Sequence, residues 1–334
     1  MGEPALIKKD PYLKPFEKQI TGRYQRVKEK EKELCGNKSL SDFACGHLHY
    51  GLHFQDGKWI YNDWLPGADE VWLVGDFSQW QPRKEFRLAP EKNGNFTAEF
   101  SAETFDHKAL YRLMVKRNEN MYDRIPAYAR RVVRDAETGI FNAQVWHPEK
   151  PYSFQRENPK DDRPPLVYEA HVGMASEEGK TASFIEFKED VLPRIVKAGY
   201  NTIQLMAIQE HPYYGSFGYH VSSFFAVSHV FGTPDELKEL IDEAHKNGLR
   251  VIMDIVHSHA VKNEVEGLSK YDGTEYQYFH AGSRGQHPAW DSRCFDYGKN
   301  QVIHFLLSNI KFWLEEYRFD GFRFDGITSM LYLD

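Results

Sequence analysis

The stretch PDELKELIDEAHKNGLRVIMDIV, residues 234–256, decides the fold, because it predicts a helix that leads directly into a buried strand. Thr233 is placed to cap this helix, Pro234 occupies its first position, and Glu236 stands where a capping box needs a carboxylate. Gly248 is suited to end the helix, since glycine readily adopts the left-handed backbone that follows many helices. The apolar run after Gly248 predicts a strand that continues to the end of the stretch.

The alternation of strand and helix extends on both sides of this stretch. Strands are predicted at residues 166–172, 202–208, 249–256 and 319–325, and helices at 183–198, 234–247 and 300–317. This alternation is typical of a parallel sheet with helical crossovers, and both a doubly wound sheet and a (β/α)8 barrel begin in this way. No glycine-rich phosphate loop follows the first strand, which weakens the dinucleotide-binding alternative. Because four strands cannot close a barrel of eight, we expect a truncated (β/α)8 TIM barrel of about four βα units.

The first half of the chain has a different pattern. Residues 44–147 contain short strand candidates separated by turn residues, which predicts an all-β sandwich. Residues 148–165 carry five prolines among charged residues, and proline blocks regular pairing, so a domain boundary is predicted there. A charged run at 14–34 predicts a solvent-exposed helix. The predicted division is an N-terminal helical segment at 1–43, the sandwich at 44–147, a proline-rich linker at 148–165 and the barrel portion at 166–334.

Composition disfavours several classes of function. The 334 residues carry a formal net charge of −7, which makes nucleic acid and anionic membranes poor candidates as partners. No apolar run approaches the roughly 18 residues of a transmembrane helix, and no signal-peptide core stands at the N-terminus. Cys35, Cys45 and Cys294 form no CxxC pair, so we expect neither a disulfide framework nor structural zinc, and a reducing compartment fits. Aromatic residues make up 15% of the chain and serve either core packing or stacking on sugars.

The segment GFRFDG, residues 321–326, carries the most informative chemistry. Alternate residues of a strand face opposite sides, so Phe322 and Phe324 share one face while Arg323 and Asp325 share the other. A guanidinium two residues from a carboxylate favours the ionised carboxylate. At the C-terminal end of a barrel strand such a carboxylate is placed to act as a nucleophile, although a purely structural Arg–Asp pair is also compatible with the sequence.

Two further segments end on the same predicted face of the sheet. DIVHSH, residues 254–259, places Asp254 near a strand end and His257 and His259 in the following loop. The two histidines are compatible with metal chelation or with hydrogen bonding in a polar core. YYGSFGY, residues 213–219, is aromatic and glycine-rich, and Tyr219 either stacks on a sugar ring or packs within the loop.

Taken together and in this order, DIVHSH and GFRFD resemble two signature regions of the α-amylase superfamily of glycoside hydrolases and transglycosidases, glycoside hydrolase family 13. Longer stretches resemble the 1,4-α-glucan (glycogen or starch) branching enzymes more specifically, and this resemblance covers essentially all of residues 10–334. The stretches are YEAHVGM at 168–174, QLMAI at 204–208, SFGY at 216–219, WDSR at 290–293 and FLLSN at 305–309.

The resemblance implies a carbohydrate-binding sandwich like family 48 modules, with Trp64 and Trp80 where the family places aromatics around a glucan site. Packing of both tryptophans within the sandwich is an equally good interpretation. The implied reaction is a retaining double displacement that cleaves an α-1,4-glucan and transfers the segment to a 6-hydroxyl, without metal or cofactor.

The resemblance also assigns roles to individual residues. Asp325 matches the nucleophile and Arg323 the residue that orients it. His259 matches a histidine that contacts the sugar, Tyr219 a tyrosine that stacks on it, and Asp254 a carboxylate that supports the site.

One departure from the family is decisive for activity. The family's acid/base glutamate and its third, stabilising aspartate lie on later strands, and Glu264, Glu266 and Glu275 do not match them. We therefore expect a truncated branching enzyme that is inactive as a lone polypeptide, with exposed apolar surface that promotes aggregation. Smaller departures at Gln209, Pro212 and His229 put chain-length preference in doubt, not the class of reaction.

Three alternatives stay open. A debranching enzyme or another α-glucan hydrolase of the superfamily shares the Asp–His and Arg–Asp signatures. A non-catalytic glucan-binding fragment would use residues 44–147 alone, and a metal-dependent hydrolase would use His257 and His259. For the preferred reading we expect an α-1,4-glucan (glycogen, amylose or starch) as partner, a cytoplasmic location, and a monomer when the protein is full length.

Overall fold

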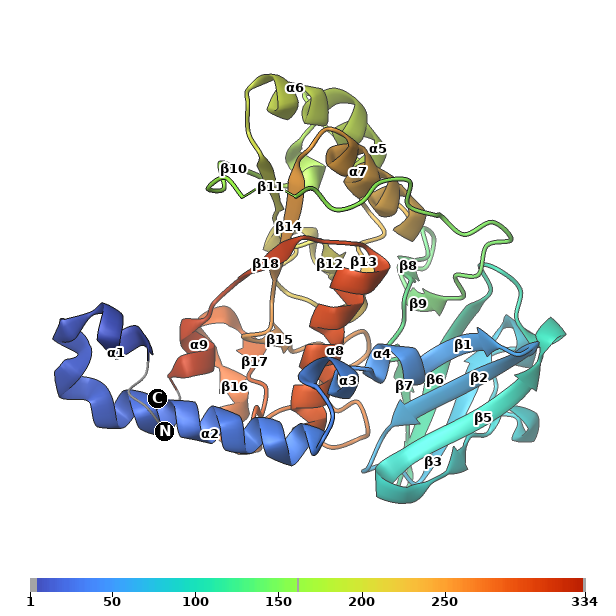
Figure 1. The fold of residues 1–334 in the computed structure, drawn as a ribbon. Helices are drawn as coiled ribbons and strands as arrows, with labels where there is room; N and C mark the ends of the chain where they lie inside the picture. The colour runs from blue at the N-terminus through green and yellow to red at the C-terminus, as the bar shows by residue number, and fades with distance from the viewer. Residues whose placement is uncertain (1–4, 161, 333–334) are drawn as a thin grey trace.

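The computed structural model describes residues 5–160 and 162–332, and these form a helical segment, a β-sandwich and an open parallel sheet (Figure 1). Parts of the predicted N-terminal segment, linker and barrel portion, namely residues 1–4, 161 and 333–334, lie outside the described residues. In the described part, no helix is both long and apolar enough to cross a membrane.

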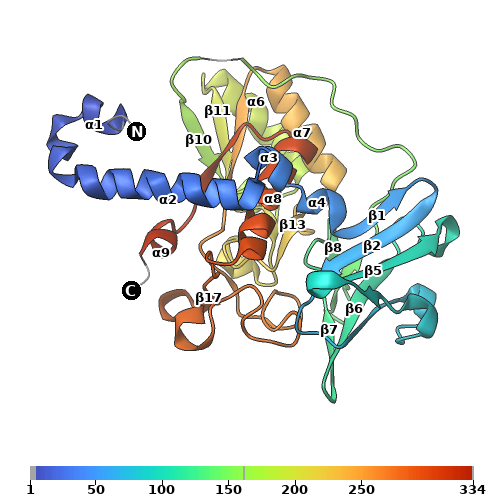
Figure 2. The same ribbon diagram turned by 60° about the horizontal axis from the view of Figure 1, so that its bottom comes forward.

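The helical segment ends on the body of the molecule. It consists of α1 (Ala5–Lys9), a 3-10 turn (Pro11–Phe16), α2 (Glu17–Cys35), α3 (Leu40–Phe43) and α4 (Gly46–His49). No residue of α2 is buried, and the helix extends outward in Figures 1 and 2, so the predicted solvent-exposed helix is confirmed. α4 lies in the region predicted as all-β, which corrects that prediction for its first few residues.

Two antiparallel sheets form the sandwich, with strand orders β1-β2-β5-β4 and β3-β6-β9-β8, and β7 pairs with β6. Buried side chains of both sheets belong to one hydrophobic cluster, among them Trp59 and Tyr61 of β2, Leu73 of β3 and Leu113 of β6. The predicted sandwich is therefore confirmed. Its strands are β1 (Gly51–Gln55), β2 (Lys58–Trp64), β3 (Glu70–Gly75), β4 (Ala89–Pro90), β5 (Asn95–Ser101), β6 (Leu110–Arg117), β7 (Asn120–Arg124), β8 (Val132–Arg134) and β9 (Phe141–Gln144).

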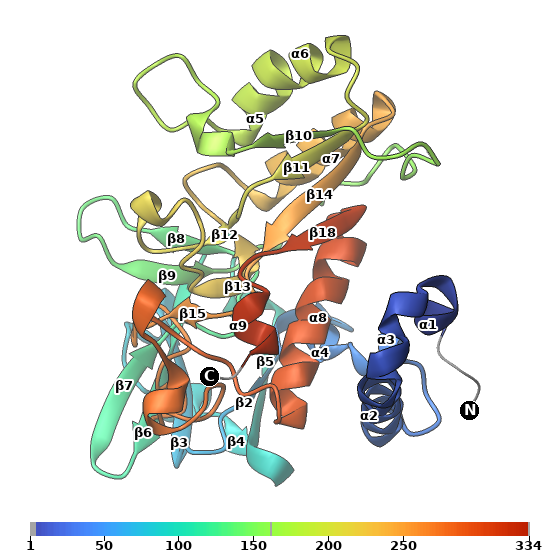
Figure 3. The same cartoon turned by 90° about the vertical axis from the view of Figure 1, so that its left-hand side faces the viewer.

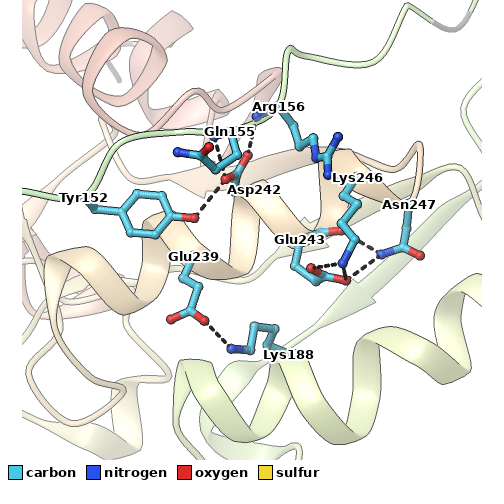
Figure 4. A network of polar contacts seen from close by, with 9 residues as sticks. All are labelled: Tyr152, Gln155, Arg156, Lys188, Glu239, Asp242, Glu243, Lys246 and Asn247. Atoms are coloured by element: carbon cyan, nitrogen blue, oxygen red, sulfur yellow. Dashed lines mark hydrogen bonds and ion pairs between the residues drawn. The ribbon is translucent and has the colours of Figure 1, made fainter.

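The proline-rich linker has no helix or strand in its described residues, yet its contacts fix it to the helices that follow (Figure 4). Asp242 on α7 (Pro234–Lys246) is buried and accepts three hydrogen bonds from the linker. The donors are the Tyr152 hydroxyl at 2.8 Å, the Gln155 amide at 2.8 Å and the Arg156 amide at 2.9 Å. Proline composition predicted the irregular backbone but gave no sign of this attachment.

Beyond the two sheets of the sandwich, four parallel strands in the order β10-β11-β14-β18 form the parallel sheet (Figure 3). Each parallel strand pairs with the one that precedes it along the chain in this sheet, so the spatial order of the strands follows the chain order. A (β/α)8 barrel has this arrangement, whereas in a doubly wound sheet the strand order reverses partway across the sheet. The predicted fold class, a sandwich followed by part of a TIM barrel, is confirmed. The strands are β10 (Val167–Ala170), β11 (Thr202–Leu205), β14 (Arg250–Ile255) and β18 (Gly321–Phe324). The helices are α5 (Phe184–Glu186), a π-helical turn (Phe187–Val191), α6 (Leu192–Lys197), α7, α8 (Asn300–Glu316) and α9 (Thr328–Leu331).

The ends of α7 follow the sequence prediction closely. The Thr233 hydroxyl accepts from the Glu236 amide at 3.3 Å, while the Glu236 carboxylate accepts from the Thr233 amide at 2.6 Å, which completes the capping box. Gly248 has φ +75°, so it supplies the left-handed backbone that ends the helix. Leu237, Ile241 and Ala244 are buried against the sheet side of this amphipathic helix.

Short strands interrupt the alternation and carry the loops around the sheet's C-terminal edge. Sequence periodicity did not predict them, because four of these strands have only two residues and the fifth, β13, is buried along its whole length without alternation. They are β12 (Gln209–Glu210) and β13 (Ser223–Val227) after β11, and β15 (Ala260–Val261), β16 (Gln286–His287) and β17 (Ser292–Arg293) after β14.

A buried polar cluster joins the sandwich to these loops. The Asp63 carboxylate of β2 accepts from the hydroxyl of Tyr61 at 2.7 Å and from that of Tyr271, which belongs to the loop after β15, at 2.5 Å. The Tyr271 hydroxyl also accepts from the Ala127 amide at 2.9 Å. Burial raises the pKa of Asp63 to about 6, against the opposing effect of the two tyrosine hydroxyls.

Candidate functional site

The site is built where β14 and β18 end side by side. The two strands pair in parallel with Asp254 opposite Arg323. Arg323 Nη1 donates to Asp254 Oδ2 at 2.7 Å and to Asp325 Oδ1 at 3.0 Å, so one guanidinium nitrogen is shared by two carboxylates. The predicted contact between Arg323 and Asp325 is therefore present, and the contact with Asp254 adds a partner that alternation alone did not indicate.

Asp254 is fully buried and accepts three hydrogen bonds, one from each of three side chains. Besides Arg323, the Tyr219 hydroxyl donates to its Oδ2 at 2.6 Å and Gln204 Nε2 donates to its Oδ1 at 2.8 Å. Burial raises the pKa of Asp254 above its ordinary value, although Tyr219 and Arg323 both act to lower it. Burial and the bond to Asp254 likewise raise the pKa of Tyr219.

Arg323 stays charged in this arrangement. Burial lowers its pKa, but the carboxylates of Asp254 and Asp325 outweigh that effect, and the pKa of Arg323 ends above its ordinary value. Its side chain is 46% exposed and that of Asp325 is 21% exposed, so the Arg323–Asp325 end of the network is open to a ligand while Asp254 is not. On the opposite face of β18, Phe322 packs against the core and Phe324 is exposed at the edge of the sheet.

Gln204 and Glu169 belong to the network but were not singled out from the sequence. Gln204 Nε2 donates to Glu169 Oε1 at 3.0 Å as well as to Asp254, and the register of β10 and β11 places Glu169 opposite Gln204. Polar side chains thus cross the sheet from β10 to β18. The signal that could have found them is a carboxylate or amide side chain inside each of two mostly apolar predicted strands, which is costly unless that side chain has a partner.

The two histidines after β14 have different protein partners. His259 Nε2 lies 2.9 Å from the Tyr219 carbonyl and its Nδ1 2.9 Å from the Ser258 hydroxyl, so His259 holds the loop that carries Tyr219. His257 Nε2 lies 2.9 Å from Asn309 Oδ1 on α8. Burial lowers the pKa of each histidine to about 4, and both are neutral at physiological pH. The described residues contain no group of three or more His, Cys, Asp or Glu side chains arranged to hold a metal ion.

Trp64 and Trp80 lie on the sandwich, away from the Arg323 network. The Trp64 ring packs edge-on against Tyr278, with centroids 5.7 Å apart, and its Nε1 donates to the Asn93 carbonyl at 3.2 Å. Trp64 also lines a cavity of about 410 Å³ between the sandwich and the loops of the parallel sheet. Trp80 Nε1 donates to Asp76 Oδ1 at 3.0 Å within its own turn. A role of either ring in glucan binding stays a prediction.

Two known families match separate parts of the chain. Residues 49–129 match the family described as carbohydrate-binding module 48 (isoamylase N-terminal domain), and residues 189–332 match the family described as alpha amylase, catalytic domain. A solved pullulanase from Paenibacillus barengoltzii has the same fold over 82% of this chain and 47% of its own, with a TM-score of 0.68 and 21% identity. The pullulanase SAP, solved in complex with maltotetraose, aligns over 88% of this chain and 43% of its own, with a TM-score of 0.69 and 19% identity.

Relatives found by sequence indicate which enzymes of the α-amylase superfamily this chain resembles. The 1,4-alpha-glucan-branching enzyme of Yarrowia lipolytica is 45% identical over 98% of this chain and 49% of its own length. Those of Dictyostelium discoideum and Felis catus are 44% and 45% identical over 98% of this chain, and 49% and 48% of their own lengths. The chain belongs to the 1,4-alpha-glucan-branching enzyme family of the α-amylase superfamily. It spans about half the length of the curated relatives it matches.

Proposed function

We propose that this chain carries the nucleophile side of a 1,4-α-glucan branching site, which cleaves an α-1,4-glucan and transfers the segment to a 6-hydroxyl. The observation that carries the proposal is the sharing of Arg323 Nη1 between the buried Asp254 and the more open Asp325 at adjacent strand ends. A strand end at the C-terminal face is where barrel enzymes place reacting groups. The identity of about 45% with branching enzymes supports the same assignment.

In the proposed reaction Asp325 attacks the anomeric carbon of the glucan and forms a covalent glycosyl-enzyme with the donor segment. Arg323 holds the attacking carboxylate in place with one hydrogen bond of 3.0 Å. Asp254 does not react, because it is fully buried and its oxygens are already bonded to Tyr219, Gln204 and Arg323. A 6-hydroxyl of an acceptor glucan then displaces the segment with retention of configuration, and no metal or cofactor takes part.

The reaction also needs a carboxylic acid that protonates the leaving oxygen and later activates the acceptor hydroxyl. We propose that none of Glu264, Glu266 and Glu275 has this role. Glu264 is paired with Lys270 at 2.7 Å, on the loop that packs toward the sandwich. Activity of the 334 residues alone is therefore not expected, and the acid is sought in the half of the relatives that this chain does not span.

A branching assay tests the proposal. Amylose is incubated with this chain and with a version extended by the second half of a relative, and iodine colour is followed together with new α-1,6 linkages. We expect branching only in the extended protein, and its loss in Asp325→Ala. Branching by the 334 residues alone would show that the acid lies within them, with Glu264, Glu266 and Glu275 as the next variants.

Two other functions would give different results in the same assay. A hydrolase of the superfamily would release reducing ends from the extended protein without new branches. A non-catalytic glucan-binding module would retain glycogen without either product, and that binding would depend on Trp64 and Trp80.

We also propose a cytoplasmic location and a monomeric full-length protein, which fractionation and light scattering test; the three free cysteines support a reducing compartment.

A further inference from the structure

A stacked pair of aromatic rings stands beside Asp325 and has no part in the network described above. β16 and β17 form a short antiparallel hairpin whose loop carries Trp290, and the Trp290 ring folds back onto His287. The two rings are parallel within 4°, with centroids 4.3 Å apart. Trp290 remains 38% exposed, although His287 covers one part of it.

The position of Trp290 next to Asp325 follows from Gly326. A Cβ atom on Gly326 would lie 2.9 Å from Cζ3 and from Cη2 of Trp290 and 2.7 Å from the Ser258 hydroxyl, so only glycine leaves room for the ring edge. Gly326 also has φ +58°, a backbone that glycine adopts without strain. The residue directly after Asp325 therefore contacts the indole, and the His259 ring lies 5.0 Å from it on another side.

The hairpin is held rigidly in this place. β17 pairs with β15, the strand that directly follows His259, and Arg293 of β17 is buried, with its Nε donating to the Gly285 carbonyl at 2.9 Å. His287 Nε2 lies 3.0 Å from the Ser329 hydroxyl on α9. The indole is thus positioned before any ligand arrives, which reduces the entropy that binding must remove.

The His287 side of the pair borders a space large enough for a ligand. His287 lines a cavity of about 600 Å³, within the usual range for small-molecule sites, together with aromatic Tyr297 and polar Gln286 and Ser329. A single exposed tryptophan needs no explanation by itself. This one lies against the glycine after Asp325 and stacks on His287, which itself lines the cavity.

We propose that Trp290, backed by His287, binds the apolar face of a glucose ring in a subsite next to the one where Asp325 reacts. The inference rests on the proposed function, since it takes an α-glucan as the ligand. His287 is a positioning residue in this arrangement, because it acts through the ring of Trp290 and supports the face that the sugar does not cover.

The test observes Trp290 directly in the 334-residue chain. The seven tryptophans are labelled with 5-fluorotryptophan, each ¹⁹F resonance is assigned by its Trp→Phe variant, and maltoheptaose is titrated in. We expect the Trp290 resonance to shift with ligand. Trp290→Ala should weaken binding about tenfold, which corresponds to about 1.4 kcal/mol, and Trp290→Phe should weaken it less.

Matched variants separate stacking from a structural effect. His287→Phe keeps a flat ring behind Trp290 and should bind as the wild type does, whereas His287→Ala should bind more weakly. Trp72→Phe, on β3 of the sandwich, should leave binding at the Trp290 site unchanged. The dispersion of the remaining ¹⁹F resonances shows whether each variant is folded.

The outcomes distinguish this inference from the proposed function. If maltoheptaose binds but the Trp290 resonance stays fixed and Trp290→Ala binds equally well, the inference is wrong and the proposed function is untouched. If no tryptophan resonance shifts and calorimetry detects no binding of maltoheptaose, α-glucan recognition by the chain is wrong, and the inference is overturned with it.

Discussion

Arg323 donates hydrogen bonds to two carboxylates through a single nitrogen atom, Nη1. Removing the guanidinium should change the pKa of the buried carboxylate, Asp254. Burial raises the pKa of Asp254 and the charge of Arg323 opposes that rise. Arg323→Gln should therefore raise the pKa of Asp254 further, whereas Arg323→Lys should raise it less because the positive charge stays. Carboxyl ¹³C NMR across a pH titration measures the change. An unchanged pKa in Arg323→Gln would assign control of Asp254 to Tyr219 and Gln204.

His257 predicts how stability depends on pH. Burial lowers its pKa to about 4, whereas an unfolded histidine has a pKa of about 6.5, so only the unfolded chain takes up a proton between these values. The neutral His257 thus contributes stability above pH 6.5 that is lost as pH falls toward 4, by up to about 3 kcal/mol. Urea unfolding at pH 7 and pH 5 measures the loss.

The comparison that isolates His257 uses two substitutions. His257→Gln should show a smaller difference in unfolding free energy between pH 7 and pH 5 than the wild type. His49→Gln alters an exposed histidine on α4 and should keep the wild-type difference. An equal pH dependence in His257→Gln and the wild type would mean that other groups cause the acid sensitivity.

Among the elements, α7 anchors the linker through one side chain, and this attachment can be measured. Asp242→Ala removes the acceptor of three hydrogen bonds, two of them from linker amides, and should lower the free energy of unfolding by about 2–3 kcal/mol. It should also speed proteolytic cleavage between residues 148 and 165. Glu243→Ala on the same helix removes surface contacts with Lys246 and Asn247 and should change stability by less than about 0.5 kcal/mol. Equal cleavage rates in both variants would contradict the anchoring role.

Local signals account for the elements that sequence predicted well. The capping box and C-terminal glycine of α7 lie within a few residues of each other, so their effect is visible in the sequence itself. The strand predicted at 202–208 ends earlier, at Leu205, because the chain leaves the sheet there to form β12. The helix predicted at 183–198 is present but contains a π-helical turn, which no local pattern indicated.

Contacts between distant segments account for what sequence did not predict. Alternation within β18 correctly placed Arg323 and Asp325 on one face. It could not place Asp254 against Arg323, because that contact depends on the register of two strands separated by α8. The Gln204–Glu169 bond and the attachment of the linker to Asp242 depend on tertiary packing in the same way.

At the scale of the whole molecule, Tyr271 ties the loops of the parallel sheet to the sandwich. Tyr271→Phe removes a donor to the buried Asp63 carboxylate and leaves the Ala127 amide without its acceptor, which should cost about 2–3 kcal/mol. The loss should separate the unfolding of the sandwich from that of the parallel sheet in calorimetry. Tyr276→Phe changes an exposed tyrosine of the same loop and should have little effect. A single unshifted transition in Tyr271→Phe would show that apolar packing alone couples the two parts.

The linker's second attachment has a consequence for synthesis on the ribosome. Asn158 Nδ2 donates to the Arg318 carbonyl at 3.1 Å and to Asp320 Oδ1 at 2.8 Å, partners that lie 160 and 162 residues later in the chain. The sandwich precedes the linker and can fold as soon as it emerges, because domains generally fold as units during translation. The linker cannot complete its contacts until Asp320 has left the exit tunnel. At about 5–20 residues per second, the nascent linker is open to proteases for roughly ten seconds or more after the sandwich is complete.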